Sequence, residues 1–165
     1  MSELKSASCI KRYKNNPVLS DKDIPYNATL IFNAGVTKYK GKYLMVFRND
    51  YEDTKGSDRL AGTNMGIATS DDGFHFIAND KPISFSEKIK DNDTSRIYDP
   101  RLTVIEDELY ICFAMDTGHG VRGGIAKTAD LENFEVLNIT VPDNRNMVLF
   151  SEKIGGEYVR LGRPF

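Results

Sequence analysis

The chain has 165 residues, of which 40% are hydrophobic and 28% are charged, a balance typical of a globular domain rather than of a disordered segment. Its formal net charge of -2 offers no basic surface for nucleic acid, and no apolar run is long enough for a secretory signal or a membrane span. Cys112 lies in an apolar run far from Cys9, which predicts a buried thiol rather than a disulfide. These features favour a cytoplasmic protein that binds neither nucleic acid nor membranes.

The apolar patterns along the chain are short, rich in Val, Ile, Tyr and Phe, and bounded by Gly, Asp or Asn, which predicts β-strands and almost no helix. After an N-terminal extension over residues 1–27, hairpins are expected over Asn33–Phe47, Leu102–Ala114 and Met147–Leu161. Their expected turns are Lys40-Gly41-Lys42, Glu106-Asp107-Glu108 and Gly155-Gly156.

A second element follows the first hairpin and is repeated after the second hairpin. The segment Gly66–Ser70 and the turn Asp71-Asp72-Gly73 match Gly124–Thr128 and the residues that follow it, and the offset from Gly66 to Gly124 equals that from Phe76 to Phe134. Each unit therefore contains two hairpins, or four strands, which is one blade of a β-propeller.

The fold expected from this repeat is all-β, one partial domain of about two and a half four-stranded antiparallel blades. Blade 1 is expected over residues 28–80, blade 2 over 97–139, and the start of blade 3 over 144–165. A propeller closes with about four to eight blades, so the chain is expected to be an incomplete ring. A small open β-sandwich of about ten strands is the alternative. The run from Lys90 to Arg96 is expected to be a surface linker, and Gly123-Gly124 to lie in a loop.

Polar residues at the ends of innermost strands are the candidates for function, because a propeller places its functional groups where these strands meet the central channel. Three clusters qualify. They are Phe32-Asn33-Ala34-Gly35 with Arg48-Asn49-Asp50, Ile97-Tyr98-Asp99-Pro100-Arg101, and Asp143-Asn144-Arg145-Asn146 with Arg163.

These residue types suit acid catalysis and anion binding. A partly buried carboxyl at Asp99 could act as a general acid, because burial raises the pKa of a carboxyl group. Arg145 and Arg163 on neighbouring strands could bind a tetrahedral oxyanion through their planar forks of donors. Each cluster also has a structural explanation: Asp-Pro is a common strand entry, Asn49 and Asp50 can form a turn, and arginines pair with acidic neighbours. No spacing of His, Cys, Asp and Glu indicates a metal site.

Taken together, the clusters resemble glycoside hydrolase family 130, which comprises inverting mannoside phosphorylases and some β-mannosidases built on five-bladed propellers. The resemblance runs in order over nearly the whole chain and covers about the first half of a family member. The motifs that carry it are Asn15-Asn16-Pro17-Val18-Leu19, Phe32-Asn33-Ala34-Gly35-Val36, Phe47-Arg48-Asn49-Asp50, Tyr98-Asp99-Pro100-Arg101-Leu102-Thr103, Asp143-Asn144-Arg145-Asn146 and Arg163-Pro164-Phe165.

The resemblance implies a role for each matching residue. Asp99 would be the single catalytic acid, and Asn33 and Arg48 would hold the mannosyl unit. The other implied substrate-binding residues are Asn49, Asp50 and Tyr98. The implied phosphate ligands are Arg145, Asn146 and Arg163. No cofactor is implied, and inorganic phosphate would be the co-substrate.

The function favoured by these residues is phosphorolysis of a β-mannoside (mannobiose, a manno-oligosaccharide or mannosyl-glucose) to α-mannose 1-phosphate. Inverting hydrolysis needs an acid and a base, whereas phosphate arrives already anionic and needs no base carboxylate. Two alternatives stay open: a β-mannosidase of the same fold, and an inactive remnant or sugar-binding fragment. A homo-oligomer and assembly with a complementary half also stay open.

Overall fold

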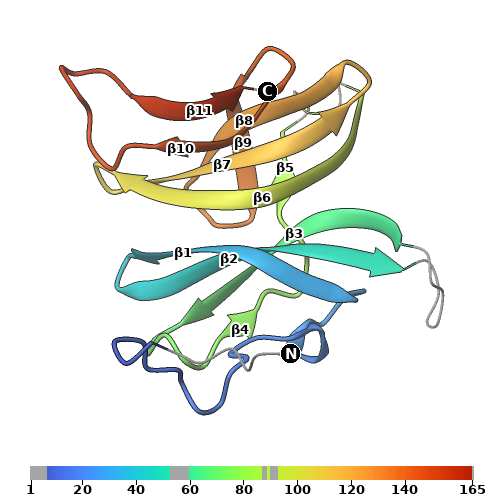
Figure 1. Cartoon of the computed structure of the whole chain (residues 1–165), viewed down its shortest axis with the longest axis vertical. Helices are drawn as coiled ribbons and strands as arrows, with labels where there is room; N and C mark the ends of the chain where they lie inside the picture. The colour runs from blue at the N-terminus through green and yellow to red at the C-terminus, as the bar shows by residue number, and fades with distance from the viewer. Residues whose placement is uncertain (1–6, 53–59, 87–88, 90–92, 165) are drawn as a thin grey trace.

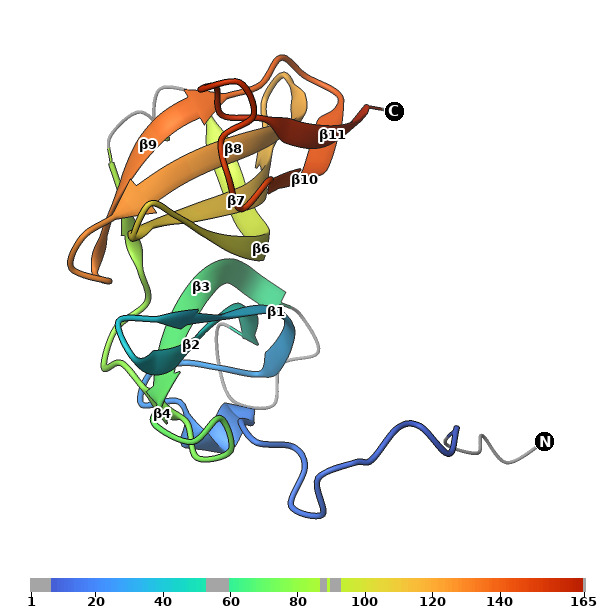
Figure 2. The same cartoon turned by 90° about the vertical axis from the view of Figure 1, so that its left-hand side faces the viewer.

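The computed structural model describes residues 7–52, 60–86, 89 and 93–164. They form three successive sheets, which follow one another from bottom to top in Figure 1 and are seen from the side in Figure 2. The first sheet contains, in order, β1 (Leu30–Tyr39), β2 (Lys42–Glu52), β3 (Leu60–Ser70) and β4 (Ile77–Ala78). The second has the order β5 (Ser84–Phe85), β9 (Asn133–Ile139), β8 (Gly120–Thr128), β7 (Glu108–Thr117) and β6 (Thr94–Ile105). The third pairs β10 (Asn144–Leu149) with β11 (Arg160–Pro164).

A short 3₁₀ turn, η1 (Asp21–Asp23), precedes the first sheet. Within the same ranges, no helix has the length and apolar character needed to cross a membrane. The two cysteines are free, as expected from the sequence, with Cys112 buried and Cys9 exposed. Burial raises the pKa of the Cys112 thiol to about 11.

The predicted hairpins are confirmed by strand pairing, and their turns explain why the chain reverses there. Lys40 and Gly41 have φ values of 48° and 82°, and Glu106 and Asp107 have φ values of 50° and 63°. Two successive positive φ values define the type I′ turn, which matches the twist of the strands it joins. Gly155-Gly156 forms a similar tight turn, at the tip of the longer connection between β10 and β11.

The repeat predicted from the sequence is confirmed by two equivalent turns, one after β3 and one after β8. In the first, Asp72 Oδ1 accepts a hydrogen bond of 2.9 Å from the backbone N–H of His75. In the second, Asp130 Oδ1 accepts one of 2.9 Å from the backbone N–H of Asn133. The same side chain therefore closes the same turn in successive sheets.

The second sheet is buried on both faces, which distinguishes a propeller from a two-layered sandwich. One face packs on the first sheet and the other on β10. The first interface contains Leu44, Val46, Met65 and Ile67 from one sheet and Leu109, Ile111, Phe113, Met115 and Phe134 from the other. The second contains Ile105, Tyr110, Cys112, Ile125, Met147 and Leu149. The chain is thus an all-β partial β-propeller, in which each sheet covers a face of its neighbour.

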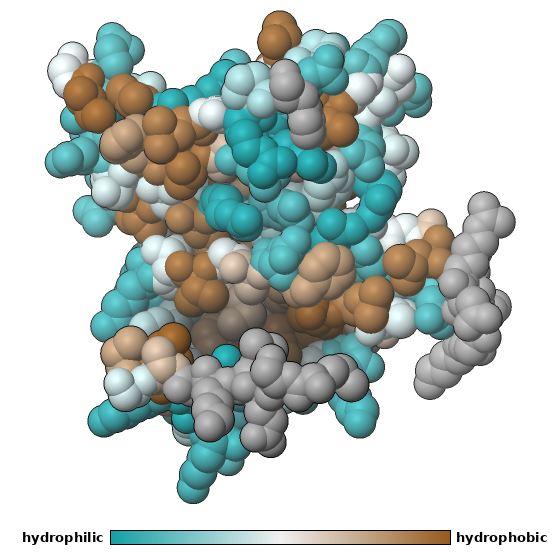
Figure 3. Space-filling model, viewed as in Figure 1, coloured by the Kyte–Doolittle hydropathy of each residue, from teal (hydrophilic) through white to brown (hydrophobic). Residues whose placement is uncertain are grey.

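The outer faces of this stack differ. The N-terminal segment covers the first sheet with Leu19 and Ile24, which pack on Met45 and Phe47. At the other end, apolar side chains around β10 and β11 are exposed, and Figure 3 shows hydrophobic surface there, at the upper left. These side chains are Val148, Phe150, Ile154, Tyr158 and Leu161.

Three details differ from the sequence expectations. The chain between the first two sheets adds a short strand, β5, that runs parallel to β9. Thr94–Arg96 is part of β6 rather than of a surface linker, because Thr94 and Arg96 pair with the end of β7; residues 90–92 lie outside the described residues. Gly123-Gly124 is not in a loop but is buried within β8.

The glycines of the central strands leave room for aromatic rings. A Cβ added to Gly124 would lie 2.2 Å from the Phe113 ring, and one added to Gly66 would lie 2.2 Å from the Phe47 ring. We expect Gly124→Ala to lower the free energy of unfolding by about 1–3 kcal/mol, because the ring must leave its rotamer to make room. Urea denaturation measures this change, and an unchanged midpoint would contradict the close packing.

Candidate active site

The three innermost strands share a β-bulge at the residues singled out in the sequence. The strand register shifts between Phe32 and Gly35 in β1, between Tyr98 and Arg101 in β6, and between Arg145 and Val148 in β10. Each bulge contains an Asn or Asp with positive φ, namely Asn33 (49°), Asp99 (56°) and Asn146 (55°). Asn and Asp enter this backbone region more readily than other non-glycine residues, and a bulge redirects side chains. These residues therefore occupy equivalent positions in successive sheets.

Asp99 is held by two residues of the first sheet. Asn33 Nδ2 donates a hydrogen bond of 2.8 Å to Asp99 Oδ1. Arg48 Nη1 lies 3.6 Å from the same oxygen. The Asp99 side chain is 16% exposed, so a small molecule can reach it while protein surrounds most of it. The carboxyl group of one sheet is thus oriented by an amide and a guanidinium of another.

Arg48 is fixed by a bidentate ion pair. Its Nε and Nη2 donate hydrogen bonds of 2.8 Å each to the two carboxylate oxygens of Asp50. Its guanidinium carbon also lies 4.6 Å from the centre of the Phe32 ring and 5.0 Å from that of Tyr98. An arginine placed between two rings and a carboxylate has little freedom to move.

Asp50 anchors this arginine from inside the protein. Thr63 Oγ1 donates a further hydrogen bond of 2.7 Å to Asp50 Oδ1. Burial raises the pKa of Asp50, but the hydrogen bonds from Arg48 and Thr63 outweigh burial, so the pKa lies below its ordinary value. Asp50 is thus a charged partner of Arg48 at neutral pH.

We expect Asp50→Asn to lower the free energy of unfolding by about 3 kcal/mol at pH 7, because the partly buried guanidinium of Arg48 loses its bidentate counter-charge and keeps only the more distant Asp99, at 3.6 Å. The pKa of Asp50 falls on folding, so its contribution is complete above the ordinary value of 3.8 and is lost as the pH falls through the lower folded value. Denaturation of both proteins between pH 7 and pH 2 measures this. A difference that grows toward acid would contradict the ion pair.

Asn49 is not brought to this cluster. Its side chain is fully buried, and its Nδ2 donates hydrogen bonds to the Asn27 carbonyl oxygen at 2.9 Å and to Asn64 Oδ1 at 3.1 Å. Successive side chains of a strand point to opposite faces, so Arg48 and Asp50 share one face of β2 and Asn49 takes the other. The structure therefore gives Asn49 structural contacts on the other face of β2, and its contact with a substrate stays a prediction.

Tyr98 forms a hydrogen bond within the second sheet. Its hydroxyl donates one of 2.6 Å to Asp116 Oδ1. Burial, followed by the hydrogen bond to Asp116, raises the pKa of Tyr98 to about 12. Asp116 was not singled out in the sequence, where nothing distinguishes it from the other acidic residues near strand ends.

The predicted phosphate ligands lie on the third sheet. Arg145 and Arg163 are direct partners in the β10–β11 ladder, so their side chains share a face. The backbone N–H of Arg163 donates a hydrogen bond of 3.2 Å to Asn144 Oδ1. Asn146 Oδ1 is buried and accepts no hydrogen bond within the described residues, which leaves its acceptor unsatisfied. Arg145 lies on β10, the strand of the third sheet that packs on the second sheet, whereas Arg163 lies one strand further out, on β11.

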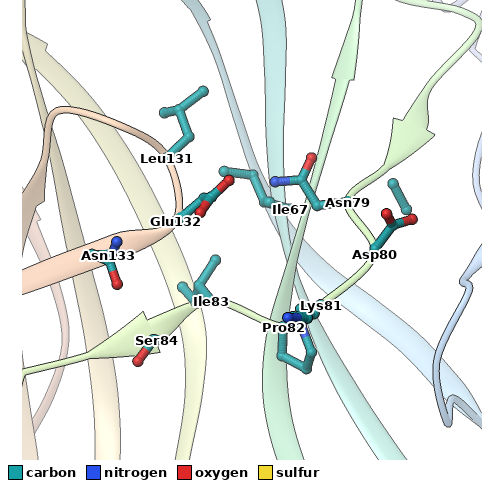
Figure 4. Close-up of a pocket in the computed structure, with 11 residues that line it drawn as sticks. Ile67, Asn79, Asp80, Lys81, Pro82, Ile83, Ser84, Leu131, Glu132 and Asn133 are labelled. Atoms are coloured by element: carbon teal, nitrogen blue, oxygen red, sulfur yellow. The ribbon is translucent and has the colours of Figure 1, made fainter.

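A cavity of about 610 Å³ lies elsewhere, between the β4–β5 connection and the turn between β8 and β9 (Figure 4). Asp80, Lys81, Glu132 and Asn133 are among its lining residues. None of the predicted site residues contributes to it. Across the part of the chain that the structure describes, no group of three or more His, Cys, Asp and Glu residues is arranged to hold a metal ion. Asp99 with its partners Asn33 and Arg48, the Asp99 cluster, is therefore the candidate active site.

The described chain is thus a partial propeller in which a carboxyl group on an innermost strand lies beside a guanidinium group of the preceding sheet. Comparison with protein families matches residues 6–163 to the family described as beta-1,4-mannooligosaccharide phosphorylase, glycoside hydrolase family 130. The chain belongs to this family.

Individual relatives agree with the family. The chain is 34% identical to a beta-1,4-mannooligosaccharide phosphorylase of Ruminococcus albus, over 97% of this chain and 49% of the relative. It is also 34% identical to a 4-O-beta-D-mannosyl-D-glucose phosphorylase of Bacteroides fragilis, over 92% of this chain and 40% of the relative. The chain spans about half the length of the curated relatives it matches.

A solved structure shows the same fold. It is that of a β-1,2-mannobiose phosphorylase from Listeria innocua in complex with β-1,2-mannobiose. It superposes with a TM-score of 0.77 at 25% identity and covers 93% of this chain and 58% of that one. The partial propeller thus corresponds to part of a larger one in that relative.

Proposed function

We propose that the protein acts as an inverting glycoside phosphorylase on β-mannosides, with Asp99 as its single catalytic acid. The observation that carries this proposal is the position of Asp99 between two sets of groups. On one side Asn33 and Arg48 of the first sheet contact its carboxylate. On the other, the third sheet, whose strand β10 carries Arg145, packs on the sheet that carries Asp99. The family and the names of its relatives support the same reaction.

The two sides suit two substrates. Asn33, Arg48 and Tyr98 offer amide, guanidinium and ring surfaces to the mannosyl unit, and Asp50 keeps Arg48 in place. Arg145, Asn146 and Arg163 would bind phosphate, since guanidinium groups match its oxygens with paired donors and stay charged at any working pH. No cofactor takes part in this scheme.

The proposed reaction breaks the bond between the mannosyl C1 and the oxygen of the leaving sugar. Asp99 supplies the proton that this oxygen acquires, and a phosphate oxygen forms the new bond to C1 from the opposite face. The configuration therefore inverts, and a β-mannoside yields α-mannose 1-phosphate. Phosphate is already an anionic nucleophile, so the reaction needs no second carboxylate to activate water.

Assays with and without phosphate test the proposal. Mannobiose, manno-oligosaccharides and mannosyl-glucose are the substrates to compare, because the relatives differ in the mannoside that their names give. We expect turnover that requires phosphate. Equal turnover without phosphate would indicate a β-mannosidase, and binding of a mannoside without turnover would indicate a sugar-binding fragment.

The cellular setting and assembly belong to the same proposal. A reaction that consumes inorganic phosphate and releases a sugar phosphate suits the cytoplasm. A homo-oligomer or a pairing with a complementary half would cover the apolar side chains exposed around β10 and β11. Size-exclusion chromatography with light scattering distinguishes these assemblies from a monomer.

A further inference from the structure

Two pairs of neighbouring residues meet between the first two sheets. Asp50 and Thr63 are direct partners in the β2–β3 ladder, and Arg96 and Asp116 are direct partners in the β6–β7 ladder. Partners in an antiparallel ladder place their side chains on the same face of the sheet. The ends of these four strands therefore bring two carboxylates, a guanidinium group and a hydroxyl group together.

Arg96 connects the two pairs. Its Nε donates a hydrogen bond of 3.1 Å to Thr63 Oγ1, and its Nη2 lies 3.6 Å from Asp50 Oδ2. Its Nη1 lies 3.8 Å from Asp116 Oδ2. Each of the three guanidinium nitrogens thus has an oxygen atom of the protein as a neighbour, so the group is suited to holding other side chains rather than a substrate.

The hydroxyl of Thr63 extends this contact to the other oxygen of Asp50. An arginine only donates hydrogen bonds, whereas a threonine hydroxyl both donates and accepts. Because Thr63 Oγ1 accepts from Arg96, its own proton is directed toward Asp50 Oδ1, 2.7 Å away. Arg96 therefore acts on both carboxylate oxygens of Asp50, on Oδ2 directly and on Oδ1 through Thr63.

The same carboxylate fixes Arg48 in the candidate active site. Arg48 Nη2 donates a hydrogen bond of 2.8 Å to Asp50 Oδ2, the oxygen that Arg96 also faces. Arg48 Nη1 lies 3.6 Å from Asp99 Oδ1. The contacts thus run from Arg96 through Asp50 to Arg48, which reaches the Asp99 carboxylate.

We propose that Arg96 is a positioning residue for mannoside binding, which orients Arg48 through Asp50. The proposal rests on the function proposed above, in which Arg48 binds the mannosyl unit. Without Arg96, Asp50 loses the guanidinium group that the second sheet supplies, and the Thr63 hydroxyl can turn away from the carboxylate. Arg48 is then less firmly oriented before the sugar binds, which weakens binding.

Substitutions of Arg96 test the proposal through the two KM values. Its side chain is 41% exposed and solvent screens its charge, so we expect Arg96→Ala to raise the KM for mannoside about three- to tenfold. The KM for phosphate should change less than about twofold, since Arg145 and Arg163 lie on the third sheet. Arg96→Lys keeps the charge but not the Nε donor, so it should recover part of the mannoside affinity. It takes the place of Arg96→Ala if thermal unfolding shows that the alanine variant is not folded.

Lys127 provides the matched control. It lies in the same sheet as Arg96, its side chain is similarly exposed, and its Nζ lies 3.6 Å from Glu108 Oε1. Glu108 begins β7, whereas Asp116 lies near the other end of that strand. Lys127→Ala should leave both KM values unchanged. The proposal fails if Lys127→Ala raises the mannoside KM as much as Arg96→Ala does, or if Arg96→Ala changes the two KM values equally.

A double variant tests whether Arg96 acts through Asp50 or on the sugar itself. Thr63→Val removes the hydroxyl that connects Arg96 to Asp50 Oδ1 and keeps the branched shape of the side chain. If Arg96 acts through Asp50, Arg96→Ala raises the mannoside KM by a smaller factor in the Thr63→Val background than in the parent. Equal factors in the two backgrounds would contradict the proposal.

Calorimetric titration with β-1,4- and β-1,2-mannobiose in phosphate-free buffer separates this proposal from the phosphorylase function, since it needs no turnover. We expect the parent to bind mannobiose and Arg96→Ala to bind it about three- to tenfold more weakly. The same result in a protein without phosphate-dependent turnover would uphold the role of Arg96 and overturn the function. Phosphate-dependent turnover with equal binding by the two proteins would do the reverse, and no binding by the parent would overturn the role of Arg96.

Discussion

Replacing Asp99 with asparagine is expected to lower kcat for phosphorolysis by about 10²–10⁴-fold, the contribution of a general acid. Asparagine keeps an acceptor for the 2.8 Å hydrogen bond from Asn33, and it also tolerates the φ of 56° at this position. The substitution therefore removes the transferable proton and the charge 3.6 Å from Arg48, and keeps the hydrogen bond from Asn33. Steady-state kinetics at saturating phosphate and mannoside measure the loss, and thermal unfolding confirms that the variant is folded.

A matched control for this substitution is Asp107→Asn. Asp107 also has a positive φ, 63°, but it lies in the exposed β6–β7 turn, away from the Asp99 cluster. The Asp107→Asn variant should retain the activity of the parent. If Asp99→Asn kept more than about a tenth of the parent kcat, the proton would have to come from another group.

Replacing Arg145 with alanine is expected to raise the apparent KM for phosphate about 10–100-fold, because a hydrogen bond to a charged group contributes about 1.5–3 kcal/mol. The KM for mannoside should change much less, since Asn33 and Arg48 contact the other side of Asp99. The phosphate KM of Arg145→Lys should lie between those of the parent and Arg145→Ala, because lysine keeps the charge but not the planar fork of donors. Initial rates over a grid of both substrate concentrations measure these effects.

Arg160→Ala provides the control for Arg145→Ala. Arg160 lies in the same β10–β11 hairpin but is exposed, and its Nη1 donates a hydrogen bond of 3.0 Å to Asn138. Its loss should leave the phosphate KM unchanged. If Arg145→Ala and Arg160→Ala had equal effects, the change would reflect net charge rather than a phosphate site.

The parts of the fold that could be predicted from the sequence are those determined by residues close to one another along the chain. The turns at Lys40-Gly41 and Glu106-Asp107 are local features, and the repeated Asp72 and Asp130 turns are recognisable by their spacing. The two-residue strand β5 was not predictable, because its pairing with β9 joins residues far apart in the chain and has no periodic pattern of its own.

The candidate site was predictable where a polar residue interrupts an innermost strand. Asn33, Asp99 and Asn146 stood out for this reason, although their equivalence as bulge residues with positive φ required the strand register. Asn49 lies on the other face of β2 from Arg48 and Asp50, which the sequence could not show, because a run of polar residues in a strand does not reveal which of them share a face. Asp116 could not be found, since the hydrogen bond that it accepts from Tyr98 depends on the pairing of β6 with β7.

The most direct test of the account is an NMR experiment that follows phosphorus and the anomeric proton while the protein acts on a β-mannoside in phosphate buffer. We predict that α-mannose 1-phosphate is the first product and that it forms in step with the loss of inorganic phosphate. Free mannose released while phosphate stays constant, or a sugar phosphate of β configuration, would contradict inverting phosphorolysis at Asp99.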